Sequence, residues 1–381
     1  MLAEGWRPVP LPDPVVRNPV ADCHARLSPG RLGPTAKCAV RGLGIFDTPD
    51  LALAQNAHRG FRPRHFSPVD TMFSSIAIVG AGALGSYYGA RLALAGSDVR
   101  FLLRRDLALV RERGLRLREK DAARHLARVA AWARPEEIGP VDLVIVTLKT
   151  TANAVLATLL PPLLGPRTAV LTLQNGLGNE EQIAALVGAE RVMGGLCYIG
   201  VTREAPGEIT GYYSPGSMAL GEFGRPVSER VRAAEALFAG VGVKTRVVDN
   251  LAEARWQKLI WNVPYNGLAI AGGGITTDRI LADPALAAQV RPLMDEIAAA
   301  ARRFGHEVSE AFIAAQIDVT PGMGAYRPSS LVDFLAGREV EVEAIWGEPL
   351  RRAQAAGLAM PRLEALYRAL RAAGGGAVSG G

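Results

Sequence analysis

The feature that most constrains this chain is the glycine-rich stretch at residues 75–86, SIAIVGAGALGS. A short apolar run breaks into Gly80-x-Gly82-x-x-Gly85, and a helix of small residues is expected over 86–95. In this strand–turn–helix context, Gly80 makes the turn, Gly82 lets the backbone approach a pyrophosphate, and Gly85 packs the helix against the strand. The stretch therefore predicts dinucleotide binding on an α/β fold. The alternative is a glycine turn that holds no ligand.

Length and charge narrow the class of protein. The 381 residues are enough for two domains with cores of their own. The net charge of +6 could suggest nucleic-acid binding, but the arginines are scattered and no basic run is interleaved with aromatic residues. We therefore expect no nucleic acid as a partner, and the positive charge suits an anionic cofactor and substrate equally well.

Cysteine usage and hydropathy exclude further classes. The cysteines are Cys23, Cys38 and Cys197, an odd number without a CxxC pair, so no disulfide framework, zinc site or other metal site is expected. A reducing cytoplasm is the default location. No apolar run reaches the roughly 18–20 residues that a membrane span needs, so no membrane association is expected.

Residues 1–72 differ from the rest because prolines recur and apolar periodicity is poor. No signal-peptide pattern is present. Because Met72 directly precedes the first strand, we favour a non-native extension that arises from an early start codon. A disordered tail and a targeting segment remain as alternatives.

The residues after the second expected strand bear on the choice of cofactor. This strand, 98–103, ends at Arg104-Arg105. Many NAD-binding folds place an acid there to hold the ribose 2′-hydroxyl, whereas an arginine attracts a 2′-phosphate. Arg104 therefore favours NADP over NAD, and the alternative is a solvated surface arginine.

Two later strands also end in polar residues. The strand at 142–148 runs into Lys149, and the strand at 168–173 runs into Gln174-Asn175-Gly176. Open α/β sheets bind ligands at the carboxyl ends of their strands. Lys149 could equally be an ordinary strand-end lysine, and Asn175 could be turn chemistry. Further strands are expected at 192–200, 207–212, 217–222 and 244–248, with a helix at 229–239.

The remainder of the chain has the character of a helical domain. We expect it over residues 250–372, with the alternating stretch 339–343 overridden by its helical context. The predicted organisation is an extension (1–72), an α/β dinucleotide-binding domain of Rossmann type (73–249), an all-helical domain (250–372) and a flexible Gly-rich tail (373–381).

The second informative stretch is WQKLIWNVPYN at residues 256–266. Lys258, Asn262 and Asn266 are spaced i, i+4, i+8 and would share one helix face in otherwise apolar sequence. A buried lysine is costly unless it is paired. One reason to keep it is proton transfer, since an ammonium can donate a proton to a carbonyl oxygen as charge develops there. A solvated polar face is the alternative. Pro264 predicts a kink near Ile260 that could displace Asn266.

A third stretch, residues 327–343, holds Ser329 and Glu341. Ser329 could cap a helix, and Glu341 could be a surface carboxylate.

Taken together, these stretches resemble the 2-dehydropantoate 2-reductase (ketopantoate reductase) family over about residues 74–372. The resemblance lies in GAGALGSYYGARL, TLK at 147–149, QNGLGNEE at 174–181, WQKLIWN with Asn266, and SSLVDFLAGREVEVEAIWG at 329–347. It implies a Rossmann domain that binds NADP(H), a helical domain, an active site between the two, and reduction of a small 2-oxo acid in pantothenate biosynthesis.

The resemblance also implies roles for individual residues. Lys258 would be the general acid, and Glu341 would bind near the nicotinamide ribose and the substrate. Residues expected at the cofactor are Gly80, Gly82, Ala83, Leu84, Gly85, Arg104, Lys149 and Asn175. Residues expected at the substrate are Asn175, Asn262, Asn266 and Ser329.

Some positions depart from the family pattern. Thr276 stands where some members carry another asparagine, Ser330 where methionine is common, and Val340 where a small polar residue is common. These departures keep a second reductase reading open, on another branched 2-oxo acid. A non-catalytic NADP-binding sensor is the other alternative, and a homodimer is one open possibility for the assembly.

Overall fold

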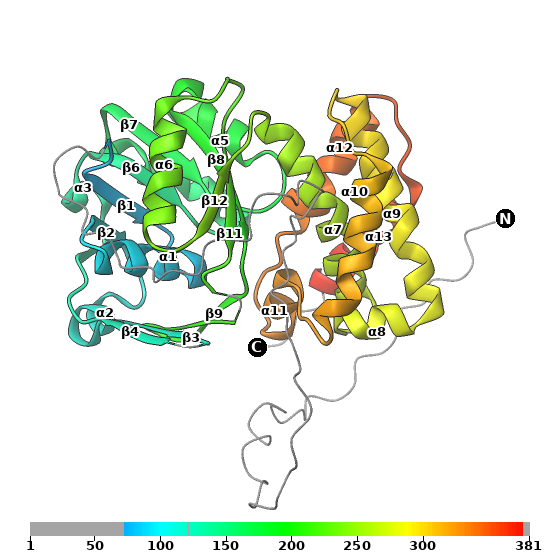
Figure 1. Ribbon diagram of the computed structural model, residues 1–381, viewed down its shortest axis with the longest axis horizontal. Helices are drawn as coiled ribbons and strands as arrows, with labels where there is room; N and C mark the ends of the chain where they lie inside the picture. Colours follow the sequence, from blue (N-terminus) through cyan, green and yellow to red (C-terminus); the bar gives the residue numbers. More distant parts are fainter. Residues whose placement is uncertain (1–71, 121, 213, 376–381) are drawn as a thin grey trace, which may run out of the picture.

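The computed structural model describes residues 72–120, 122–212 and 214–375, and Figure 1 shows a sheet-containing part beside a helical part. The predictions for residues 1–72 and for most of the tail fall outside the described residues. The α/β class, with an N-terminal Rossmann-type part and a helical C-terminal part, is confirmed.

The main sheet has the strand order β12-β11-β8-β7-β6-β1-β2-β5. Its strands are β1 (Ser75–Val79), β2 (Asp98–Leu102), β5 (Ala131–Trp132), β6 (Val141–Val146), β7 (Leu164–Thr172), β8 (Val192–Tyr198), β11 (Ser217–Glu222) and β12 (Lys244–Val247). From β5 to β8 all pairs are parallel, and β11 then runs antiparallel to β8. The chain reverses its direction across the sheet between β1 and β6, which is where such folds bind ligands.

The apolar run of β1 explains its central place in the sheet. Ile76 and Ile78 pack on one face of the sheet with Tyr88 of the following helix, whereas Ala77 and Val79 pack on the other face. A strand buried on both faces reads as a continuous apolar run rather than an alternating one.

Helices and short 3-10 segments cover the main sheet. They are α1 (Ala83–Leu94), α2 (Leu107–Arg113), α3 (Pro135–Ile138), η2 (Thr150–Val155), α4 (Leu156–Leu159), η3 (Pro161–Leu163), α5 (Asn179–Val187), η4 (Ala189–Arg191) and α6 (Glu229–Gly240). Helix α1 begins three residues earlier than expected, because Gly82 already stands at its N-cap.

A second, smaller sheet was not predicted. It has the order β4-β3-β10-β9 and consists of β3 (Leu115–Glu119), β4 (Ala122–Leu126), β9 (Val201–Ala205) and β10 (Glu208–Gly211). No helix or strand was predicted between residues 106 and 141. Leu115 and Leu117 are nevertheless buried in alternation with exposed arginines, which is the pattern of a half-buried strand.

The helical part is built around α7 (Leu251–Ala271), which packs against α9, α11 and α13. Its other elements are α8 (Thr277–Ala282), α9 (Pro284–Arg303), α10 (Glu310–Val319), η5 (Thr320–Met323), α11 (Ser329–Leu335), the π-helical turn η6 (Glu343–Gly347), α12 (Glu348–Ala355) and α13 (Pro361–Gly375). Figure 1 shows α7 beside the main sheet, with α9 on its far side and α11 below it.

Helix α7 has a clear start and an unexpected continuity. The side chain of Asn250 accepts a hydrogen bond from the backbone N–H of Glu253 and so caps the helix. Pro264 does not end the helix, which continues for seven residues beyond it to Ala271. The alternating stretch 339–343 forms no strand, as expected, but it is not helical throughout, because the helical turn begins only at its end.

Candidate active site

The glycine turn has the geometry that the sequence predicts. Gly80 has a φ of +105°, and a Cβ there would lie 2.5 Å from the backbone nitrogen of Leu148. A Cβ on Gly85 would lie 2.4 Å from both the carbonyl oxygen of Gly80 and the hydroxyl of Thr147. A Cβ on Gly82 would meet no protein atom within 4 Å. The turn at Gly80 and the close packing at Gly85 are therefore confirmed, and the backbone at Gly82 borders open space.

The N-terminus of α1 has the features of an anion-binding site. No side chain caps the helix, and no acidic residue lies in its first turn. The first N–H groups of a helix have no partner within it, and the helix dipole adds partial positive charge there. The backbone of Ala83, Leu84 and Gly85 could therefore hold the pyrophosphate of a dinucleotide, which stays a prediction.

Arg104 lies in the turn that follows β2, with its side chain exposed. Neither Arg104 nor Arg105 makes an ion pair or hydrogen bond with a described residue. Two unpaired guanidinium groups at the end of this strand suit the 2′-phosphate of NADP. Whether Arg104 binds it stays a prediction.

Lys149 connects the two parts of the molecule. Its Nζ lies 2.6 Å from a carboxylate oxygen of Asp333 and 3.2 Å from Oε2 of Glu341. The other oxygen of Glu341 accepts a hydrogen bond of 2.9 Å from the backbone N–H of Thr150. Arg338 also pairs with Asp333, at 2.9 Å. The two carboxylates of the helical part therefore bind the residues that directly follow β6.

These contacts set the charge state of Lys149. Burial alone would lower the pKa of its ammonium, but the negative charges of Glu341 and Asp333 raise the pKa above its ordinary value. Lys149 is therefore charged throughout the physiological pH range.

The loop that carries Asn175 touches the helical part directly. The backbone N–H of Leu177 donates to the carbonyl oxygen of Ala344 at 2.9 Å. Gly176 has a φ of +85°, and a Cβ on it would lie 2.3 Å from the same oxygen. Only glycine fits this contact, which fixes the loop against the π-helical turn η6.

An amide network supports Asn175 from behind. The side chain of Gln174 donates to the carbonyl oxygen of Leu148 and to Oδ1 of Asn153, at 2.8 and 2.7 Å. Asn153 donates to Asn179 at 3.1 Å, and Asn179 donates to the backbone carbonyl of Asn175 at 2.8 Å. Asn175 is therefore held by a connected network and is more than a turn residue.

Lys258 lies against this loop. Its Nζ donates to Oδ1 of Asn175 at 2.7 Å and to the backbone carbonyl of Cys197 at 3.0 Å, and it lies 5.2 Å from the centre of the Tyr198 ring. Burial lowers the pKa of Lys258 to about 8; the positive charge of Arg255 also lowers it, and Glu341 opposes the shift. The ammonium is thus held in place and can give up its proton near neutral pH.

The two asparagines of α7 have different surroundings. Asn262 is partly exposed and its side chain makes no hydrogen bond with a described residue, so its amide could bind a ligand. Asn266 is buried, and its Oδ1 accepts the backbone N–H of Ser330 at 3.0 Å. Asn266 therefore holds the start of α11, and only its amide N–H groups are left for a substrate.

Ser329 does not cap α11. Pro328 stands at the N-cap and Ser329 is the first helical residue, with an exposed side chain. The side chain of Asn266 takes over the capping that Ser329 could have provided, which leaves the Ser329 hydroxyl available.

Comparison with known proteins decides the family. The model of the family described as "Ketopantoate reductase PanE/ApbA" matches residues 76–225, and the model of its C-terminal part matches residues 250–374. The chain belongs to the ketopantoate reductase family. Members of this family are enzymes of the oxidoreductase class, so the family resemblance inferred from the motifs is confirmed.

Individual members and solved structures agree with this placement. A 2-dehydropantoate 2-reductase from Nostoc sp. is 38% identical over 300 residues, which cover 77% of this chain and 93% of that protein. The crystal structure of 2-dehydropantoate 2-reductase from Geobacter metallireducens GS-15 is 42% identical with a TM-score of 0.76, and covers 78% of this chain and 99% of its own. A D-mandelate dehydrogenase solved with NADH and anilino(oxo)acetate shares the fold, at 24% identity and a TM-score of 0.72, covering 80% of this chain and 99% of its own.

Several residues of the candidate site were not predicted from the sequence. Asp333 binds Lys149, and Thr147 donates its hydroxyl to the carbonyl of Gly80 at 2.6 Å. The spacing of Asp333 four residues after Ser329 would place both on one helix face, and this was the available signal. The pairing of Arg255 with Glu180 had no local signal at all, since the two residues are 75 positions apart.

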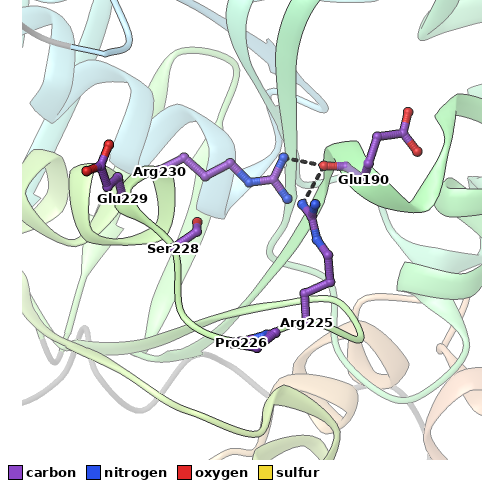
Figure 2. Close-up of a pocket in the computed structure, with 6 residues that line it drawn as sticks. All are labelled: Glu190, Arg225, Pro226, Ser228, Glu229 and Arg230. Carbon is purple, nitrogen blue, oxygen red and sulfur yellow. Dashed lines mark hydrogen bonds between the residues drawn. The ribbon is translucent and has the colours of Figure 1, made fainter.

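A separate surface pocket lies away from these residues, at the start of α6. It is lined by Glu190, Arg225, Pro226, Ser228, Glu229 and Arg230. Figure 2 shows the guanidinium groups of Arg225 and Arg230 converging on the backbone carbonyl of Glu190. Both arginines also bind the buried carboxylate of Glu222, so their charges are used within the fold.

Residues 72–120, 122–212 and 214–375 contain no group of three or more His, Cys, Asp or Glu side chains arranged to hold a metal ion. Within the same residues, no helix combines the length and apolar character needed to cross a membrane.

Proposed function

We propose that this chain catalyses the NADPH-dependent reduction of the 2-oxo group of 2-dehydropantoate to (R)-pantoate. Family membership supports the reaction class, and the relatives from Nostoc sp. and Geobacter metallireducens carry the name of this activity. The geometry around Lys258 supports the assignment of the acid.

The observation that carries the proposal is the position of the Lys258 ammonium. It is held by Asn175 and by the carbonyl of Cys197, and its pKa is about 8. Such a group is largely protonated at neutral pH yet gives up its proton more readily than an ordinary lysine. In the proposed reaction, Lys258 donates this proton to the C2 oxygen of the substrate.

The cofactor site combines the glycine turn with Arg104. The backbone of residues 82–85 would hold the pyrophosphate, and Arg104 would bind the 2′-phosphate. Lys149 and Asn175 would line the nicotinamide end, because they follow the strands on that side of the switch point. When bound, NADPH supplies the hydride that adds to C2.

The substrate would lie between the two parts of the molecule. Its hydroxyl and carboxylate groups require hydrogen-bond donors, and the amides of Asn262 and Asn266 with the hydroxyl of Ser329 are of this kind. Glu341 would accept from a substrate or ribose hydroxyl while it pairs with Lys149. Thr276 is not positioned as a free donor, because its hydroxyl is bonded to Asp278.

The test is a steady-state assay of the full chain that follows NADPH absorbance. The expected result is rapid oxidation of NADPH with 2-dehydropantoate and slower oxidation with other branched 2-oxo acids. Higher kcat/KM with another 2-oxo acid would support the second reductase reading instead. Binding of NADPH without oxidation by any 2-oxo acid would support the sensor reading and exclude the proposed enzyme.

A further inference from the structure

A buried ion pair lies directly behind the Lys258–Asn175 contact. Arg255 and Glu180 are 3% and 4% exposed. Nε of Arg255 donates to Oε1 of Glu180 at 2.9 Å, and Nη2 donates to the same oxygen. Nη1 of Arg255 donates to the backbone carbonyl of Gln174 at 2.7 Å.

The pair connects the two segments that build the acid site. Arg255 lies on α7 one turn before Lys258, and Gln174 directly precedes Asn175 in the chain. Glu180 lies in the first turn of α5, which follows the Asn175 loop. One guanidinium therefore fixes the helix of the lysine to both ends of the loop that carries its partner.

A glycine next to the ion pair leaves room for the carboxylate of Glu180. Gly194 of β8 lies beside Glu180, and a Cβ there would lie 2.3 Å from Oε1 of the carboxylate. A buried ion pair repays its desolvation poorly, and apolar residues of similar size often stabilise a protein as well or better. Fold stability alone is therefore a weak reason for placing two charges at this position.

We propose that Arg255 and Glu180 act as positioning residues, which hold the carbonyl of Gln174 and thereby set Asn175 against the ammonium of Lys258. This inference rests on the proposed function of Lys258 as the acid. The ion pair would align Lys258 and influence its charge state without contacting the cofactor or the substrate.

The charges around Lys258 predict how the pKa of this lysine changes when the ion pair is altered. The groups that face Lys258 are Arg255 on its own helix, Cys197 and Tyr198 of β8, and Glu341 ahead of η6. Arg255 disfavours the protonated lysine, and Glu180 partly neutralises Arg255. Removing the charge of Arg255 should therefore raise the pKa of Lys258, and removing the charge of Glu180 should lower it.

The experiment compares Arg255→Lys, Arg255→Gln and Glu180→Gln in the full chain. Arg255→Lys keeps the charge but loses the forked geometry, so kcat should fall roughly 10- to 100-fold while the KM for NADPH changes little. In the pH profile of kcat, the alkaline limb should move up by at least about 0.5 unit in Arg255→Gln and down by a similar amount in Glu180→Gln.

The matched control is the neighbouring pair of Arg352 and Glu181. It also joins the helical part to α5, at 2.7 Å, but it is half-exposed and makes no bond to the Asn175 loop. Arg352→Lys and Glu181→Gln should leave kcat and the pH profile unchanged within about twofold.

A second readout does not depend on turnover. The lysines of the chain are Lys37, Lys120, Lys149, Lys244 and Lys258, so reductive methylation with ¹³C-formaldehyde gives a simple NMR spectrum. Lys258→Arg assigns the Lys258 signal, and its titration reports the pKa in each variant. If wild-type chain fails to reduce 2-dehydropantoate, the proposed function fails while this titration still tests the pair. Wild-type kcat in Arg255→Lys, or an unmoved Lys258 titration in both Gln variants, would overturn the inference.

Discussion

The Nζ of Lys258 lies 2.7 Å from Oδ1 of Asn175, although the two residues are 83 positions apart in the chain. Asn175 follows strand β7 of the main sheet, and Lys258 belongs to helix α7 of the helical part. The contact exists only where the two parts pack together, next to the hydrogen bond from Leu177 to Ala344. The position of the proposed acid therefore depends on the interface between the two parts.

The first prediction concerns pH. Because burial lowers the pKa of Lys258 to about 8, the protonated form needed for proton donation is lost as pH rises through that value. We expect kcat for 2-dehydropantoate reduction to be highest below about pH 8 and to fall tenfold per unit well above it. Steady-state rates at saturating NADPH give this profile, and a thermal-unfolding series over the same pH range controls for loss of fold. A flat alkaline limb would contradict the assignment.

The second prediction concerns the cofactor. Arg104 makes no ion pair within the described residues, so Arg104→Ala should leave the melting temperature unchanged. Loss of one charge-assisted contact to the 2′-phosphate should raise the KM for NADPH about tenfold or more, with little effect on NADH. Arg232→Ala is the matched control, since Arg232 is also exposed and without an ion pair in the described part of the chain. Equal loss with NADPH and NADH would remove Arg104 from the 2′-phosphate site.

The third prediction separates two glycines of the same turn. A methyl group on Gly85 would press on the carbonyl of Gly80 and the hydroxyl of Thr147, so Gly85→Ala should cost about 1–3 kcal/mol in the free energy of unfolding. Gly82→Ala meets no protein atom and should change that free energy by less than about 0.5 kcal/mol.

Dinucleotide binding should show the complementary pattern at Gly82. A methyl group there would point into the space assigned to the pyrophosphate, so NADPH affinity should fall about tenfold or more while the fold stays intact. Urea unfolding and a fluorescence titration with NADPH measure the two effects. Unchanged NADPH affinity in Gly82→Ala would contradict this placement of the pyrophosphate.

Features that depend on neighbouring residues in the chain could be predicted from the sequence. The strand expected at residues 217–222 is β11 with the same bounds, and the turn at Gly80 follows from the positive φ that glycine permits. The polar stripe of α7 was also readable, because i, i+4 spacing places Lys258 and Asn262 on one face.

Long-range relationships could not be read in the same way. Lys149 meets Glu341 across 192 positions, and no local pattern states which carboxylate a strand-end lysine will find. In the small sheet, the hairpin of β3 and β4 had a local signal that went unused, the alternation at Leu115 and Leu117, whereas the pairing of β3 with β10, about 90 positions later, had none. Asn266 shows a further limit, since its position on the predicted face was readable but its task of holding the start of α11 was not.

The most direct test of the account is the turnover of Lys258→Ala with 2-dehydropantoate and NADPH. We predict a fall in kcat of at least about 100-fold, with a dissociation constant for NADPH within about threefold of wild type, because Lys258 acts on the substrate oxygen and not on the cofactor phosphates. The melting temperature controls for loss of fold, since the variant also removes the hydrogen bonds of Nζ to Asn175 and Cys197. Near-normal kcat in Lys258→Ala would contradict the central claim that this lysine is the general acid.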